Sequence, residues 1–221
     1  MSKVCLFHTG ISTFAPLQAL AADLMPGVEF MHIVEDAMIK DVMQAGGPDA
    51  DISARIALYV MCAERAHCDI FMTACSSIGE VVEDCRRITR MTIARIDEAM
   101  VEAAIAQGSA IAVLATVETT LRPTLNLVHR KAAEQGKRIE VRQVLMADAF
   151  RALLGGDTAT HNQMVQAGVT EAAKGSDVLV LAQASMARAL AGLAPLPVPV
   201  LTSPELGMRH LRRLVDGLPP G

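Results

Sequence analysis

The 221-residue sequence is poor in aromatic residues, which make up 3% of it, with no Trp and a single Tyr. It also lacks an excess of positive charge, because 20 Lys and Arg stand against 24 Asp and Glu, for a net charge of −4. Proteins that bind nucleic acid use basic surfaces, often interleaved with aromatic residues, to neutralise phosphates and stack bases. The composition therefore argues against nucleic acid as a partner.

Cysteine and histidine residues are few, and their spacing is not that of metal ligands. The five cysteines are odd in number and contain no Cys-x-x-Cys pair, which fits reduced thiols in the cytoplasm better than a disulfide framework. No two histidines have His-x-x-x-His spacing, and no Gly-x-Gly-x-x-Gly or Walker-type loop occurs. We therefore expect a cytoplasmic protein with no metal site and no cofactor.

Long apolar runs are also missing. The first run, Val4 to Phe7, ends at His8, whereas a secretory leader needs an apolar region of about 7 to 15 residues. No window offers the roughly 20 apolar residues that cross a bilayer. We expect neither a leader nor a membrane partner.

Short apolar runs are what the sequence does contain, and its hydrophobic content of 52% is enough for a large core. Runs bounded by polar or turn residues are typical of buried strands, and longer amphipathic stretches lie between them. This alternation predicts an α/β fold with largely parallel sheets and crossover helices. The predicted strands are Val4 to Phe7, Asp69 to Thr73, Ile111 to Ala115 and Val178 to Leu181.

The chain also carries an internal repeat with an offset of 108 residues. The segment from Asp69 to Ile78 matches the segment that begins at Asp177, and the same offset pairs His8 with Thr116. We therefore predict two pseudo-symmetric lobes, residues 1–96 and 97–204, with an active site in the cleft between them. A terminal helix within residues 205–221 is expected to pack on the first lobe.

Hydroxyl-rich loops follow the predicted strands, at the sheet edge where parallel α/β proteins bind ligands. One of them contains Cys75, and each leads into a helix whose amino end can hold an anion. A helix amino end can also lower the pKa of a thiol, so Cys75 is the candidate reactive group. The other cysteines are interpreted as buried and inert; they are Cys5, Cys62, Cys68 and Cys85.

Four further side chains are weaker candidates. His8 at a strand end and His161 at a helix start could approach the cleft, although a lone His is more often structural. Arg95 and Arg122 could clamp a second carboxylate, but a surface ion pair is the more common role for either.

The loop motifs resemble those of the aspartate/glutamate racemase superfamily, which includes hydantoin racemases, maleate isomerase and arylmalonate decarboxylase. The segment from Thr73 to Ser77 is similar to the family's first cysteine loop, and Ala115-Thr116 followed by Thr119-Thr120 is similar to its central Ala-Thr-x-x-Thr segment. The resemblance covers nearly the whole chain. It implies two α/β lobes with the active site between them, and chemistry without metal, pyridoxal phosphate or nucleotide cofactors.

One departure from the family pattern bears on mechanism. The family's racemases have a second cysteine where this chain has Gln183, and an amide cannot act as a base. Racemisation would then need an unusual second base, such as His8 or His161. Isomerisation or decarboxylation needs only one thiol, with Gln183 orienting the substrate or bonding to an enolate.

Together the residues and the resemblance predict chemistry at the carbon next to the carboxylate of a small acid. The leading expectation is a racemase or isomerase that uses Cys75, with a decarboxylase as the alternative and a non-catalytic small-anion binder as a further one. We also expect a homo-oligomer. The expected substrate-binding residues are Ser12, Ser76, Ser77, Thr116, Thr119, Thr120 and Ser185.

Overall fold

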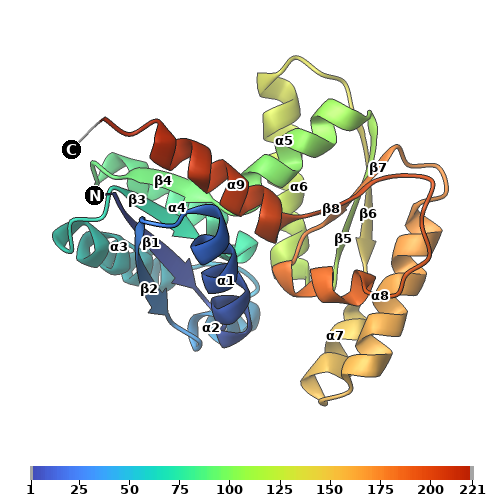
Figure 1. Cartoon of the computed structure of the whole chain (residues 1–221). Coiled ribbons are helices and arrows are strands. Elements are labelled where there is room, and N and C mark those ends of the chain that lie inside the picture. The colour runs from blue at the N-terminus through green and yellow to red at the C-terminus, as the bar shows by residue number, and fades with distance from the viewer. Residues whose placement is uncertain (1, 220–221) are drawn as a thin grey trace. The chain divides into compact units, whose positions relative to one another are not determined.

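A computed structural model describes residues 2–219, which form two compact units. The first unit contains the residues up to Ile96 together with those from Pro204 onward, and the second runs from Asp97 to Ser203. Each unit is built on one parallel four-stranded sheet (Figure 1). Among the described residues no helix is both long and apolar enough to span a bilayer.

The first sheet has the strand order β2-β1-β3-β4. Its side chains alternate between two faces, as the pleat of a strand requires. Val4 and Leu6 of β1 pack against α1 and α9, whereas Cys5 and Phe7 pack against α2, α3 and α4. The elements of this unit are β1 (Lys3–His8), α1 (Phe14–Leu24), β2 (Glu29–Val34), α2 (Met38–Ala45), α3 (Ala50–Arg65), β3 (Ile70–Thr73), α4 (Gly79–Asp84), β4 (Thr92–Arg95) and α9 (Ser203–Asp216).

The second sheet repeats this arrangement with the order β6-β5-β7-β8. Ala112 and Leu114 of β5 lie in one apolar cluster with Val165 and Val169 of α8, and Ala149 of α7 completes that layer. The elements of this unit are α5 (Glu98–Gln107), β5 (Ala110–Ala115), α6 (Glu118–Glu134), β6 (Glu140–Leu145), α7 (Ala147–Leu154), α8 (Thr158–Ala172), β7 (Val178–Leu181) and β8 (Val200–Thr202). The four strands expected from the sequence are confirmed, and each sheet gains two more.

The repeated aspartates have a structural role that is the same in both units. The Asp69 carboxylate accepts a hydrogen bond from the backbone N–H of Lys3 at 2.8 Å. The Asp177 carboxylate accepts one from the N–H of Ala110, also at 2.8 Å. Each aspartate therefore fixes the start of the central strand of its sheet, which explains why this residue recurs.

The backbone hydrogen bonds correct the sequence repeat by one residue at the central strand. The N–H of Ala74 donates to the carbonyl of Phe7 at 2.8 Å, and the N–H of Ala182 donates to the carbonyl of Leu114 at 2.9 Å. Ala182 lies 108 residues after Ala74, but Leu114 lies only 107 residues after Phe7. The pairing of His8 with Thr116 is therefore wrong, and the true counterpart of Thr116 is Thr9.

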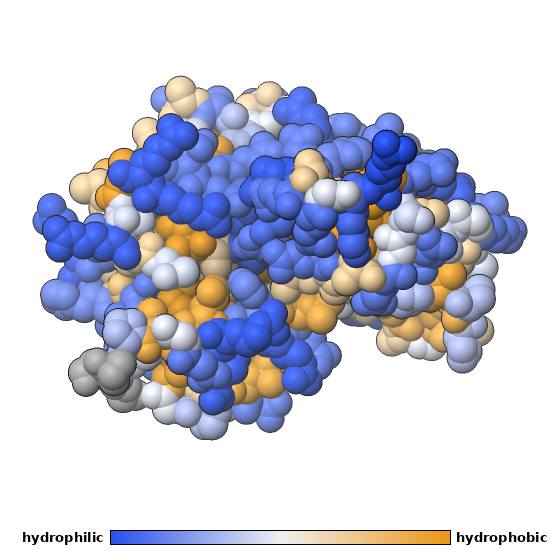
Figure 2. All heavy atoms as spheres, turned by 90° about the horizontal axis from the view of Figure 1, so that it is seen from above, coloured by the Kyte–Doolittle hydropathy of each residue, from blue (hydrophilic) through white to orange (hydrophobic). Residues whose placement is uncertain are grey.

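Hydrophilic residues cover most of the face shown in Figure 2, with apolar patches between them. Several large apolar side chains are exposed in the described residues, and Leu154, Ile11 and Leu58 are the most exposed. Ile11 lies in the 3-10 turn Ile11–Thr13 that follows β1. Apolar surface is thus present beside the polar residues at that sheet edge.

Candidate active site

Cys75 lies directly after β3, at the carboxyl edge of the first sheet. Its backbone is extended, with φ −130° and ψ 116°, and the 3-10 turn Ser76–Ile78 leads from it into α4. The Thr73 hydroxyl accepts a hydrogen bond from the Cys75 N–H at 3.2 Å and lies 3.3 Å from the Cys75 carbonyl, to which it can donate. These two local hydrogen bonds therefore fix the loop, and the partly exposed Cys75 lies at the end of the strand.

Four donors surround the Cys75 sulfur. They are the hydroxyl groups of Thr9 and Ser77 and the backbone N–H groups of Ser77 and Ile78, and each of these bonds favours the thiolate. Burial is nevertheless the largest influence, and the pKa of Cys75 is raised above its ordinary value. The expectation that the helix end would lower this pKa is wrong, because removal of the sulfur from water outweighs the donors. The resting form of Cys75 is the protonated thiol.

The other cysteines differ from the expectation in one case. All five are free, and Cys62 is exposed on α3 rather than buried. Burial raises the pKa of Cys5 to about 12, and it also raises the pKa values of Cys68 and Cys85. These three thiols are inert by their environment.

Arg95 packs against α4, the helix that follows the Cys75 loop, and does not lie at the surface. It is fully buried, and its guanidinium lies 3.0 Å from the carboxylate of Glu83. A Cβ added at Gly79 would lie 2.3 Å from Arg95 Cζ, so the guanidinium packs directly against the first residue of α4. Arg95 is therefore an ion-pair residue, as expected, but a buried one, whereas Arg122 is exposed on α6.

His8 belongs to a hydrogen-bond chain that uses both of its ring nitrogens. The Thr13 hydroxyl donates to the carbonyl of Gly10 at 3.0 Å, so its oxygen accepts from His8 Nδ1 at 2.9 Å. His8 Nε2 then accepts from Nδ1 of His32 at 3.1 Å. The geometry gives fully buried His8 a positioning role rather than that of a free base.

Both imidazoles of this pair are neutral at pH 7. Burial and the neighbouring His32 lower the pKa of His8 to about 4, and burial lowers the pKa of His32. Sequence reasoning missed His32 because it lies on β2, an edge strand whose apolar stretch is interrupted by His32 itself. It also lies far from His8 along the chain.

Thr116 and Gln183 form the corresponding arrangement in the second unit. The backbone N–H and the hydroxyl of Thr116 donate to the Gln183 carbonyl oxygen, at 2.6 and 3.0 Å. These two bonds fix the amide orientation, since only its oxygen can accept them. The amide NH₂ has no hydrogen-bond partner among residues 2–219 and is the end that can donate to a ligand.

The remaining expected residues of the second unit differ in environment. The Thr119 hydroxyl is buried and has no hydrogen-bond partner within the described part of the chain. Thr120 is buried and its carbonyl accepts from the Thr124 hydroxyl at 2.9 Å, while Ser185 is partly exposed in the 3-10 turn Ala184–Leu190. Thr119 and Ser185 are therefore the hydroxyls of this group best placed to serve a ligand.

His161 lies on the buried face of α8, in its first turn. Its Nδ1 donates to the carbonyl of Ala149 at 3.0 Å, which leaves Nε2 as an acceptor. That nitrogen is buried and has no partner among the described residues. His161 continues the stripe of Val165 and Val169, so it is a core residue with one unused acceptor.

Within the first unit the structure thus brings Cys75 together with Ser77 and with Thr9, which sequence reasoning missed. Ser76 lies between Cys75 and Ser77 in the sequence and is buried, whereas Ser12 is exposed in the turn after β1. In the second unit the structure pairs Thr116 with Gln183. That both groups bind one substrate in a cleft stays a prediction.

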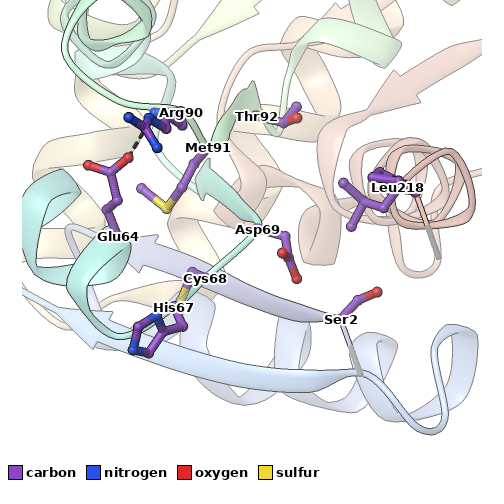
Figure 3. Close-up of a pocket in the computed structure, with 10 residues that line it drawn as sticks. Ser2, Glu64, His67, Cys68, Asp69, Arg90, Met91, Thr92 and Leu218 are labelled. Carbon is purple, nitrogen blue, oxygen red and sulfur yellow. Dashed lines mark hydrogen bonds between the residues drawn. The ribbon is translucent and has the colours of Figure 1, made fainter. Parts of the chain in front are cut away.

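A pocket of about 610 Å³ lies elsewhere on the first unit (Figure 3). Its residues Asp69 and Thr92 stand at the amino ends of β3 and β4, the edge opposite to Cys75. Glu64 lines this pocket and accepts a hydrogen bond from the backbone N–H of Arg90 at 2.8 Å. Ligands of parallel sheets collect at the carboxyl ends, so the candidate site remains at Cys75.

Within residues 2–219 no group of three or more His, Cys, Asp or Glu side chains is arranged to hold a metal ion. The chemistry available at Cys75 and Gln183 is proton transfer by a thiol and hydrogen-bond donation by an amide.

Comparison with known proteins gives a family match over most of the chain. The family model described as Asp/Glu/Hydantoin racemase matches residues 7–211. No curated protein sequence matches the chain.

Several solved structures share the fold. A glutamate racemase from Bacillus anthracis has a TM-score of 0.72 and 15% identity, with 97% of this chain and 82% of the other covered. An allantoin racemase from Klebsiella pneumoniae has a TM-score of 0.70 and 16% identity, covering 98% and 88%. An aspartate racemase from Picrophilus torridus has a TM-score of 0.71 and 12% identity, covering 98% and 95%. At such identities the likeness shows the fold alone.

Proposed function

Because the chain belongs to the Asp/Glu/hydantoin racemase family, we propose that it is a cofactor-independent racemase or isomerase acting next to the carboxylate of a small acid. The observation that carries this proposal is the Cys75 loop, where four donors meet one thiol at a strand end. Such a thiol can exchange a proton with carbon, and donors of this kind stabilise the negative charge that the reaction creates.

Hydroxyl and backbone N–H groups hold the substrate carboxylate in this proposal. Ser12 and Ser76 contribute from the first unit, with Ser77 also bonded to Cys75. The buried hydroxyl of Thr119, which has no partner among the described residues, gains one when a carboxylate binds. Thr120 and Ser185 complete the set. Each well-placed donor contributes a few kcal/mol to the stabilisation of the developing charge.

In racemisation, the Cys75 thiol first gives its proton to solvent; the thiolate then removes the proton from the α-carbon, and the electron pair of the C–H bond moves onto the carboxylate. A second acid then returns a proton to the opposite face. Gln183 cannot do this, and both nitrogens of His8 are engaged. His161 Nε2 is the remaining ring nitrogen without a partner among the described residues, but it is buried and carries no proton while Nδ1 donates to Ala149. A racemase would therefore require that His161 becomes both accessible and protonated, or that water acts as the second acid.

Decarboxylation by a single thiol is the second candidate, and two observations favour it. The raised pKa of Cys75 keeps the thiol protonated at rest, as a proton donor must be. The Gln183 amide oxygen is engaged by Thr116, which leaves the NH₂ group as the hydrogen-bond donor of this side chain. The bond from the α-carbon to one carboxylate breaks, CO₂ leaves, and the electron pair spreads onto a second carboxylate. Cys75 then protonates the carbon, and solvent restores the thiol.

Proton NMR in D₂O tests the proposal on a panel of amino acids, hydroxy acids, hydantoins and substituted malonates. Wild type is compared with Cys75→Ala, and Cys62→Ala serves as the matched control because Cys62 is exposed on α3. We expect deuterium exchange at the α-carbon, or CO₂ release, in wild type and Cys62→Ala but not in Cys75→Ala. Chiral analysis separates racemase from decarboxylase.

Ligand-induced thermal shifts complete the test. Compounds that stabilise wild type and Cys75→Ala equally, with no exchange or CO₂ release in either, would replace the enzyme by a small-anion binding protein. We further propose that the protein is cytoplasmic, with reduced thiols, and forms a homo-oligomer, which light scattering measures directly.

A further inference from the structure

Two threonines occupy equivalent positions in the two units, and each bonds to the residue that follows the neighbouring strand. The corrected repeat aligns Thr9 with Thr116, and the original offset aligns Cys75 with Gln183. The Thr116 hydroxyl donates to the Gln183 amide oxygen at 3.0 Å. Phe7 of β1 and Thr73 of β3 are register partners, so Thr9 and Cys75, each two residues further on, lie side by side, and the Thr9 hydroxyl bonds to the Cys75 sulfur. The same hydroxyl therefore meets a different functional group in each unit.

We propose that Thr9 is a positioning residue for Cys75, holding the sulfur in place and stabilising its thiolate, as Thr116 holds the Gln183 amide. The proposal rests on the proposed function in one respect, that Cys75 is the reactive group. It adds a residue that sequence reasoning did not single out.

The burial of Thr9 makes this bond consequential. Thr9 is only 5% exposed, so a hydroxyl that lost the sulfur would have little access to water in exchange. A bond from a neutral hydroxyl to an amide oxygen mainly fixes orientation. The same hydroxyl bonded to a thiolate is charge-assisted and about twice as strong. The bond is therefore stronger to the thiolate than to the thiol, and it opposes the effect of burial on Cys75.

Charged groups near the loop do not confound a comparison between variants. The strands beside the loop and the helix that follows it carry Lys3 and His8 on β1, Arg95 on β4, and Glu80, Glu83 and Asp84 on α4. Arg95 and Glu83 form an ion pair, and His8 is neutral above pH 6 because of its lowered pKa. A substitution at Thr9 changes none of these side chains, so a shift in the behaviour of Cys75 reports the lost hydroxyl.

The test is the rate of alkylation of Cys75 by iodoacetamide between pH 6 and pH 10, read by peptide mass spectrometry. The variants are Thr9→Val, which keeps the shape and removes the hydroxyl, and Thr9→Ser, which restores it. Cys62 provides an exposed reference thiol in the same digest. Thr116→Val is the matched control, because its hydroxyl bonds to Gln183 and not to a thiol.

We expect the Cys75 alkylation rate of Thr9→Val at pH 8 to fall about tenfold, the effect of losing one hydrogen bond to a charged group. The midpoint of the profile moves to higher pH, while Thr9→Ser and Thr116→Val stay within about twofold of wild type. An unchanged profile in Thr9→Val, or a tenfold fall in Thr9→Ser as well, would overturn the proposal.

Unfolding is detected in the same digest, because buried Cys5 becomes alkylated when the first unit opens. If Thr9→Val exposes Cys5, then Thr9→Ala is measured instead, under the same criteria. Alkylation needs no substrate, so it separates the two proposals. An unchanged profile in Thr9→Val together with turnover that depends on Cys75 refutes only the role of Thr9. A shifted profile together with no turnover refutes only the proposed reaction.

Discussion

Lowering the pH from 7 to 5 is expected to destabilise the first unit through His8. The folded imidazole has a pKa of about 4, because it is fully buried and faces His32. An unfolded His has a pKa of about 6.5. Between these values the unfolded state binds a proton that the folded state does not, so stability present at pH 7 is lost as the pH falls.

The size of this effect follows from the gap between the two pKa values. Over the whole window the loss approaches about 3 kcal/mol, and between pH 7 and pH 5 it is about 2 kcal/mol. The pKa of His32 is lowered as well, so its contribution has the same sign. A loss of this size is a large fraction of the stability of a typical domain.

The assay uses the only tyrosine of a chain that has no tryptophan. Tyr59 packs on Phe7 in the core of the first unit, with ring centroids 5.1 Å apart, so its fluorescence reports the unfolding of that unit. Urea unfolding is measured at pH 7, 6 and 5 for wild type and His8→Asn, which cannot titrate. His129→Asn, at an exposed position on α6, is the control.

We expect His8→Asn to be less stable than wild type at pH 7, because His32 loses its acceptor, but to lose about 2 kcal/mol less between pH 7 and pH 5. His129→Asn should keep the wild-type pH dependence. Equal pH dependence in wild type and His8→Asn would refute the assignment of His8 as a buried neutral imidazole.

Three further predictions concern the loop of Cys75 and its counterpart. Gly79→Ala should cost about 1 to 3 kcal/mol, measured by urea unfolding, because the new Cβ overlaps Arg95; a neutral result would mean that the guanidinium moves freely. Arg95→Met should cost about 1 to 3 kcal/mol by removing the buried partner of the Glu83 carboxylate, which then keeps only the more exposed Arg86, and an unchanged melting temperature would contradict this. Gln183→Leu should slow turnover of any substrate found in the panel by about 10²-fold or more, whereas Gln183→Asn should retain part of it; equal rates in Gln183→Leu and wild type would remove the amide from the mechanism.

Family and fold class could be predicted from local features of the sequence. Apolar runs such as Val178–Leu181 mark strands that are buried on both faces, and they are confirmed as the central strands of the sheets. The racemase-family resemblance drawn from the Cys75 and Thr116 motifs is confirmed by the family match. The edge strands Glu29–Val34 and Glu140–Leu145 were not predicted, because partial exposure of an edge strand allows polar residues such as His32 and Gln143 to interrupt the apolar run.

Local sequence patterns were enough to predict a parallel α/β chain with two related halves and one candidate thiol at a strand end. The equivalence of Thr9 and Thr116 required the folded sheets, because the register of a strand depends on hydrogen bonds to its neighbours. The protonation state of Cys75 likewise depends on the folded structure. Its pKa reflects a balance between burial and four donors from two segments of the chain, and that balance exists only once β1 and β3 lie side by side.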